Sequence, residues 1–228
     1  MITKETLDKL PKLANVAGEQ NRVMLHSIYC DGDRLIATDG YCLAIVTPDK
    51  LDLEPAIIPL DAIRALEQGA ELSIDAGTVT VKDDYMTRTW HVEGQYLDVD
   101  QIIPTVSPLT PYIELDAREL LEVATKSHGH EYIILDSAGI VANQSKHEGG
   151  ENGAVKVLSS RGSFSVAINA SLLLDLAKSV MLPVKAARRD TYPIRLYDQL
   201  REYGPHVVKP VKAQEGFTSY GVIMPMHR

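Results

Sequence analysis

The chain has 228 residues, is 45% hydrophobic and 24% charged, and carries a formal net charge of −8. This composition is ordinary for a soluble globular protein and excludes a collagen-like or intrinsically disordered chain. The length predicts one or two domains, each large enough to bury a core.

No segment of the sequence indicates export or membrane insertion. The opening stretch MITKETLDKL lacks the apolar core of a signal peptide, and no apolar run approaches the roughly 20 residues that cross a bilayer. Two cysteines, Cys30 and Cys42, are too few for a disulfide framework in a chain of this size. We therefore expect a cytoplasmic protein with two free thiols.

The first half alternates helical and strand patterns. Apolar residues spaced by three and four predict a helix over 3–17. Asp-Gly-Asp at 31–33 lies between two apolar runs and predicts a hairpin turn, and a second hairpin is expected to turn at 76–77. Between these turns, EPAIIP (54–59) predicts a strand that leads into a helix over 60–67.

A proline-rich segment then separates two similar halves. Three prolines fall within IIPTVSPLTP (102–111), the best candidate for a linker. The strand YIEL follows, and Asp116 with Glu119 three residues later matches a capping box that opens a helix through Ser127. Strand and helix patterns therefore begin again beyond the linker.

The order of elements repeats between the halves. PAIIPLDAIRALEQG and FSVAINASLLLDLAKS each read as a strand, a polar cap and an apolar helix, with Asn169 or Ser171 as the cap of the second. This repetition predicts an α+β protein of two tandem domains, 1–107 and 108–228, each with two helices packed on antiparallel sheet.

No segment assembles a catalytic or metal site. The sequence has no phosphate-binding glycine loop, no dinucleotide fingerprint and no zinc-protease or serine-hydrolase motif. His128, His130 and Glu131 are candidate metal ligands, but a spaced third His or Cys partner is missing, which favours a solvated loop. We expect a protein that is not an enzyme and that needs no metal or cofactor, although an enzyme on an α+β scaffold stays an alternative.

Three segments, in order, resemble one known family. ATDGYCLA (37–44) resembles the ATDG-x-x-LA corner of the bacterial sliding clamp, the β subunit of the replicative DNA polymerase. GQYLDVDQIIP (94–104) is similar to the segment that closes the clamp's middle domain. AINASLLLDLAKSV (167–180) with the terminal GVIMPMHR (221–228) resembles its last domain. The resemblance covers nearly the whole chain, but only the middle and last of the family's three domains.

The resemblance implies a processivity factor. Clamp domains build a ring around duplex DNA, with helices lining the hole, and bind short linear peptides of the polymerase and the clamp loader in a groove. By matching position, the groove here would use residues of the corner, the domain junction, the last helix start and the C-terminus: Thr38, Gly40, Tyr41, Leu43, Leu97, Gln101, Ile102, Asn169, Leu172, Val222, Met224, Pro225 and Met226. The methionines suit such a groove because they are flexible and polarisable.

The predicted helices are nearly balanced in charge, whereas the rest of the chain is acidic. A ring needs an inner wall of this kind, which would contact phosphates without reading bases. The candidate DNA-facing residues are the basic residues of these helices: Lys4, Lys9, Lys12, Arg118, Lys126, Lys178, Lys185, Arg188 and Arg189.

Two features leave partner preference and assembly open. The family has His-Arg after its ATDG corner and ends in Met-Pro-Met-Arg-Leu, where this chain has Tyr41-Cys42 and Met-Pro-Met-His227-Arg228. Six domains per ring predict a homotrimer of two-domain chains, joined head to tail through sheet edges. The first half lacks most of its opening strand, so a monomer is the alternative. In that case the chain would be an adaptor or decoy that binds partner peptides without encircling DNA.

Overall fold

The computed structural model forms two compact units. Unit 1 comprises Met1–Asp98, Lys178–Pro183 and Gln214–Ser219, and unit 2 comprises Val99–Ala177, Val184–Ala213 and Tyr220–Arg228. The residues that the structure describes are 24–49, 51, 53–67, 70–92, 94–126, 132–136, 142–143, 157–163, 165–180, 193–198, 204–211 and 216–225.

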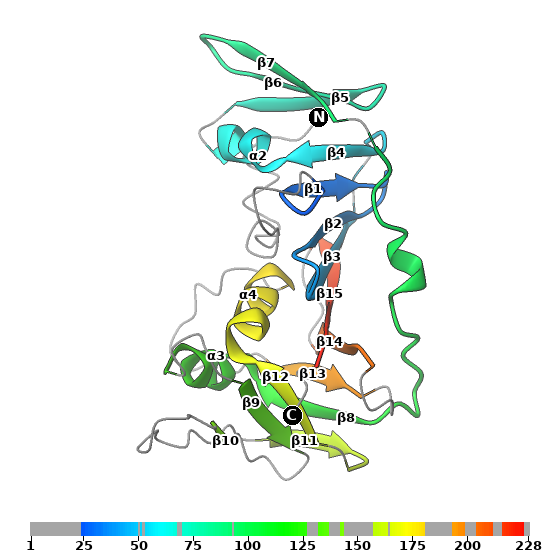
Figure 1. The fold of residues 1–228 in the computed structure, drawn as a ribbon, viewed down its shortest axis with the longest axis vertical. Helices are drawn as coiled ribbons and strands as arrows, with labels where there is room; N and C mark the ends of the chain where they lie inside the picture. The colour runs from blue at the N-terminus through cyan, green and yellow to red at the C-terminus, as the bar shows by residue number, and fades with distance from the viewer. Residues whose placement is uncertain are drawn as a thin grey trace. The chain divides into compact units, whose positions relative to one another are not determined.

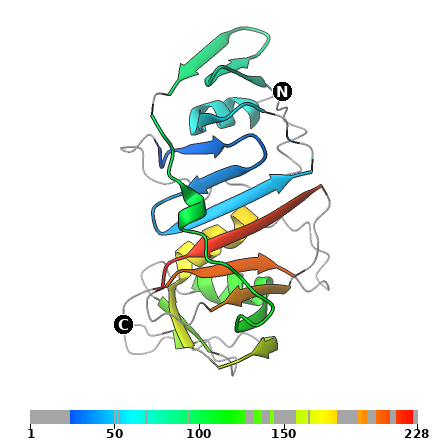
Figure 2. The same ribbon diagram turned by 90° about the vertical axis from the view of Figure 1, so that its right-hand side faces the viewer.

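Unit 1 contains two antiparallel sheets. One has the strand order β3-β2-β1-β4 and the other β5-β6-β7; Figure 2 shows β1, β2 and β3, drawn in blue, as neighbours. Their bounds are β1 Ser27–Cys30, β2 Leu35–Thr38, β3 Cys42–Pro48, β4 Ala56–Pro59, β5 Glu71–Asp75, β6 Thr78–Lys82 and β7 Thr87–His91.

Both hairpin turns predicted in this unit are confirmed. The β1–β2 turn contains Gly32 at a φ of 103°, and the β5–β6 turn contains Ala76 at 46° and Gly77 at 75°. In the β5–β6 turn both central residues have positive φ, which is the mark of the tight turns that match strand twist.

Helix α2 (Leu60–Glu67) matches the predicted bounds and covers strands of both sheets. Leu60, Ala62, Ile63 and Leu66 are buried, whereas Asp61 is exposed, as expected for one apolar helix face. This face packs against β4, β5 and β6, as Figure 1 shows. Among the described helices of the chain, none is long and apolar enough to cross a membrane.

Unit 2 contains the remaining elements, apart from the last residues of α4 and the first residues of β15, which belong to unit 1. Its strands form one antiparallel row with the order β11-β8-β13-β14-β15 and a second sheet with the order β10-β9-β12. The elements are η2 Val99–Gln101, β8 Tyr112–Asp116, α3 Ala117–Lys126, β9 Tyr132–Asp136, β10 Ala142–Asn143, β11 Val157–Arg161, β12 Ser165–Asn169, α4 Ala170–Val180, β13 Pro193–Tyr197, β14 His206–Pro210 and β15 Phe217–Ile223.

Polar caps start both of the described α-helices that begin in unit 2. The Arg118 backbone N–H donates to Asp116 Oδ1 at 2.9 Å, and the Leu172 N–H donates to Asn169 Oδ1 at 3.1 Å. These bonds satisfy N–H groups that the first helical turn leaves unpaired. The sequence left Asn169 and Ser171 as alternatives for the second cap, and the structure identifies Asn169.

Strand β15 lies close against α4. A Cβ atom placed on Gly221 would be 2.5 Å from Leu176 Cδ1, which is too short for any side chain. Glycine therefore allows this strand and helix to pack in direct contact.

Candidate functional site

The ATDG corner joins β2 to β3 through hydrogen bonds within the turn. Thr38 Oγ1 donates to the Cys42 carbonyl at 2.6 Å and accepts from the Gly40 N–H at 3.0 Å. Asp39 Oδ1 accepts from the N–H groups of Tyr41 and Cys42 at 2.7 and 2.6 Å. Asp39 was not among the predicted site residues, although an Asp that precedes a turn glycine commonly bonds the backbone two residues on.

The corner directs one side chain outward. Gly40 has a φ of 93°, which favours glycine, while no atom lies within 4 Å of a Cβ placed there. Backbone conformation, and not lack of space, therefore selects this glycine. Tyr41 is exposed at 66%, whereas Thr38, Cys42 and Leu43 are buried.

In unit 1, a second exposed apolar side chain follows Tyr96, a buried residue that stacks on the half-buried Tyr29. The Tyr96 ring stacks on Tyr29 with centroids 4.6 Å apart and an interplanar angle of 16°. Burial raises the pKa of Tyr96 to about 12. Anchored by this stack, the chain continues to Leu97, which is 47% exposed.

In unit 2, the short η2 helix presents Gln101 and Ile102. Val99 is buried, and its carbonyl accepts from the N–H groups of Ile102 and Ile103 at 2.9 and 3.1 Å. The turn thus buries its first residue and exposes the later ones. Ile102 is 45% exposed.

The start of α4 and the end of β15 supply the remaining described candidates. The side chain of Asn169 is engaged in the helix cap, and Leu172 in the first turn is half-buried. Val222 pairs with Val207 and is buried, whereas Met224, just beyond the strand, is 40% exposed. Pro225 is half-buried, and Met226 lies outside the described residues.

Exposed apolar side chains are frequent among the groove candidates. Among the described residues, eight large apolar or aromatic side chains are exposed, and four of them are groove candidates. They are Tyr41 and Leu97 in unit 1 and Ile102 and Met224 in unit 2. Three candidates, Thr38, Leu43 and Val222, instead lie in the core of their own unit. Such surfaces can bind apolar side chains of a partner.

Most of the candidate DNA-facing residues fall where the structure gives no side chain. Lys4, Lys9, Lys12, Lys185, Arg188 and Arg189 lie outside the described residues, as does the predicted helix over 3–17. For Lys126 on α3 and Lys178 on α4, only the backbone is described. Arg118, in the first turn of α3, is half-buried.

The described residues contain no metal site. Within the ranges that the structure describes, no group of three His, Cys, Asp or Glu side chains could hold a metal ion. The predicted alternative of His128, His130 and Glu131 lies outside those ranges.

Solved structures of DNA polymerase III β subunits have the same fold as this chain. The DNA polymerase III β chain of Streptococcus pneumoniae TIGR4 superimposes with a TM-score of 0.75 at 17% sequence identity, over 100% of this chain and 64% of that one. The sliding clamp of Pseudomonas aeruginosa gives 0.74 at 19% identity, and the β sliding clamp of C. crescentus gives 0.72 at 20%. Both are matched over 100% of this chain and 65% of theirs.

The chain has the sliding-clamp fold. The predicted α+β class is thereby confirmed, as is the resemblance to the clamp inferred from ATDG and the C-terminal Met-Pro-Met. The chain spans about 65% of the length of the clamps that it matches. At the level of sequence, no protein-family model matches it, and no curated protein matches it either. The clamp fold is thus evident in the backbone arrangement and only faintly in the residues.

Proposed function

We propose that the chain is a non-catalytic processivity factor of the sliding-clamp type. It would tether a DNA polymerase to duplex DNA and bind the polymerase and a clamp loader through short linear peptides. The clamp fold over the whole chain supports this function. The observation that carries it is the exposure of Tyr41, Leu97, Ile102 and Met224, which would line one peptide groove if the resemblance holds at these positions.

The groove would take a peptide of the Gln-x-x-Leu-Phe type. Buried apolar anchors dominate such interfaces, and the exposed candidates supply the apolar surface for the Leu and Phe side chains. The test is fluorescence anisotropy with a labelled peptide of this type and a scrambled control. Saturable binding to the first peptide alone supports the groove, and equal binding of both peptides contradicts it.

On DNA, the chain would act by topology. Two clamp-type units per chain need three copies to supply six, so the proposed ring is a homotrimer with its basic helix residues toward the hole. Light scattering at tens of micromolar, an order-of-magnitude range for weak assembly, tests the trimer. A protein loaded on closed circular DNA should resist salt, whereas direct binding to short linear duplex should be weak and salt-sensitive. A monomer that binds the peptide but is never retained on circular DNA would instead be an adaptor.

A further inference from the structure

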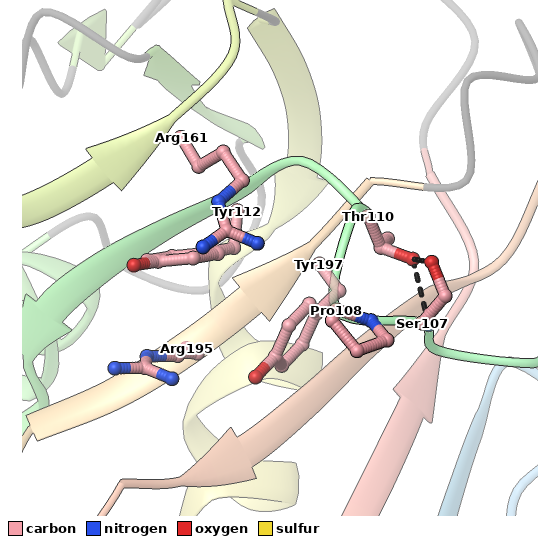
Figure 3. A pocket seen from close by; sticks show the side chains of 7 residues that line it. All are labelled: Ser107, Pro108, Thr110, Tyr112, Arg161, Arg195 and Tyr197. Atoms are coloured by element: carbon pink, nitrogen blue, oxygen red, sulfur yellow. Dashed lines mark hydrogen bonds between the residues drawn. The ribbon is translucent and has the colours of Figure 1, made fainter.

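A pocket of about 300 Å³ lies in unit 2, and none of its lining residues is a groove candidate. It forms where the ends of β8, β11 and β13 meet the turn that precedes β8. Figure 3 shows the side chains that line it: Ser107, Pro108, Thr110, Tyr112, Arg161, Arg195 and Tyr197. Its volume is at the small end of ligand sites, which suits a side chain or a short peptide.

Strand register places these side chains together. Tyr112 on β8 pairs with Arg161 on β11 and with Tyr197 on β13. Because β11 and β13 pair with opposite edges of β8, Arg161 and Tyr197 flank Tyr112 from opposite sides. Side chains alternate along a strand, so the neighbouring Ile113 faces the core while these residues share the other face.

Two guanidinium groups surround the Tyr112 ring. The Cζ atom of Arg195 is 4.6 Å from the ring centroid, and that of Arg161 is 5.5 Å away. Arg195 Nε donates to Glu114 Oε2 at 2.9 Å, and hydrogen bonds to Glu114 and Tyr197 raise the pKa of Arg195. Arg195 is thus held in one orientation by its partners.

Arg161 is the cation available to a ligand. Among the described residues it forms no ion pair, and its recorded contact is with the Tyr112 ring. The cluster holds two cations against one carboxylate, Glu114, and that carboxylate also accepts from Ser159 Oγ at 3.1 Å. A net positive charge therefore remains at the pocket, although the chain as a whole is acidic.

The turn opposite the arginines contributes a hydroxyl donor. Thr110 Oγ1 accepts from the Ser107 N–H at 2.9 Å, and Ser107 Oγ accepts from the Leu109 N–H at 3.2 Å. The two hydroxyl oxygens are 3.2 Å apart, so one hydroxyl hydrogen is used between them. The other hydrogen is left to donate to a ligand. Guanidinium and hydroxyl donors on facing walls fit an oxyanion.

We infer that this pocket binds the carboxylate of a short acidic peptide. A nucleotide base would need an open aromatic face, but the guanidinium groups lie over Tyr112, and Tyr197 lies against it with centroids 5.7 Å apart. Leu109, beside the pocket at 85% exposure, offers a contact for an apolar residue next to the carboxylate. The inference does not depend on DNA encirclement or on the peptide groove.

NMR titration of the full chain tests the site with three small peptides. Acetyl-Leu-Glu-amide carries a side-chain carboxylate, acetyl-Leu-Gly a C-terminal carboxylate, and acetyl-Leu-Gln-amide neither. We expect saturable shifts at the pocket residues for a carboxylate peptide, with a dissociation constant on the order of 1 mM, since few contacts hold it. The stronger of the two shows which carboxylate source the pocket prefers.

Matched variants assign the effect to the pocket. Arg161→Gln should weaken binding at least about tenfold, as expected for loss of a charge-assisted hydrogen bond, whereas Arg88→Gln on β7 should leave it unchanged. Arg161→Lys keeps the charge without the planar fork and should give an intermediate affinity, which secures the test if Arg161→Gln does not fold. Equal binding of the neutral peptide, non-saturating shifts, or unchanged binding in the Arg161 variants would overturn the inference. Saturable binding of inorganic phosphate without the peptides would also overturn it.

Discussion

Replacing Met224 with alanine measures what the proposed groove contributes to peptide binding. Complete burial of a Met side chain stabilises by about 1.5–3 kcal/mol relative to full exposure. Met224 is 40% exposed in the free chain, so a peptide that covers this exposed part gains about 0.6–1.2 kcal/mol. Because about 1.4 kcal/mol corresponds to a factor of ten, Met224→Ala should raise the dissociation constant about threefold to eightfold.

The assay is fluorescence anisotropy with the labelled Gln-x-x-Leu-Phe-type peptide, and Met86→Ala is the matched control. Met86 is a methionine of similar exposure, 46%, before β7 and outside the candidate groove. Its replacement should leave the affinity unchanged. Equal effects of the two substitutions, or no effect of Met224→Ala, would refute the assignment of Met224 to the groove.

Three further predictions concern the fold that supports the site. Tyr96→Phe removes a buried hydroxyl that has no hydrogen-bond partner among the described residues and keeps the stack on Tyr29. Urea denaturation should therefore show equal or higher stability, by up to about 1 kcal/mol, and a clear loss would mean that the hydroxyl is bonded in solution. Gly221→Ala places a methyl group against Leu176 and should lower the free energy of unfolding by about 1–3 kcal/mol. Thr218 is exposed on the same strand, so Thr218→Ala should lower it little. Equal losses in the two variants would contradict the close packing. Burial lowers the pKa of His206 below its usual 6.5, against the opposing effect of Asp198 at 3.7 Å. The unfolded chain therefore takes up this proton first, so the free energy of unfolding should fall as pH drops below 6.5, less steeply in His206→Gln; parallel pH profiles of the two proteins would contradict this.

Local signals in the sequence were sufficient for turns, helix bounds and the fold class. Gly32 and the pair at 76–77 sit where φ must be positive, and residues 60–67 form the helix that their apolar spacing predicts. These features depend on neighbours in the sequence, so a single chain suffices to place them.

Burial within β3 could not be predicted in the same way. Cys42 through Val46 are all buried, so the strand shows no alternation to mark which side chain faces a partner. Leu43 was accordingly assigned to the groove by resemblance, although its side chain lies in the core of unit 1. The same applies to Val222 on β15.

The sequence did not predict the pocket beside Tyr112, because the residues that line it are far apart in the chain. Tyr112, Arg161 and Arg195 come from three strands that meet only through long-range pairing. Polar residues alternate with apolar ones in YIEL and PIRLY, which indicates a solvent face but does not say which strands adjoin. Register is a tertiary property, set by the packed sheet.

The bonding pattern of the ATDG corner has a consequence for how partner choice could change over evolution. Every hydrogen bond recorded at Tyr41 in this turn uses its backbone N–H, and the phenol side chain projects away. Residue 41 can therefore be exchanged at little cost to the turn, so in the proposed groove a single substitution could retune which peptides are preferred. Position 42 has no such freedom, because its side chain is buried and an arginine there would carry its charge into the core. The corner thus places a position that the fold leaves free to vary beside one that the fold constrains.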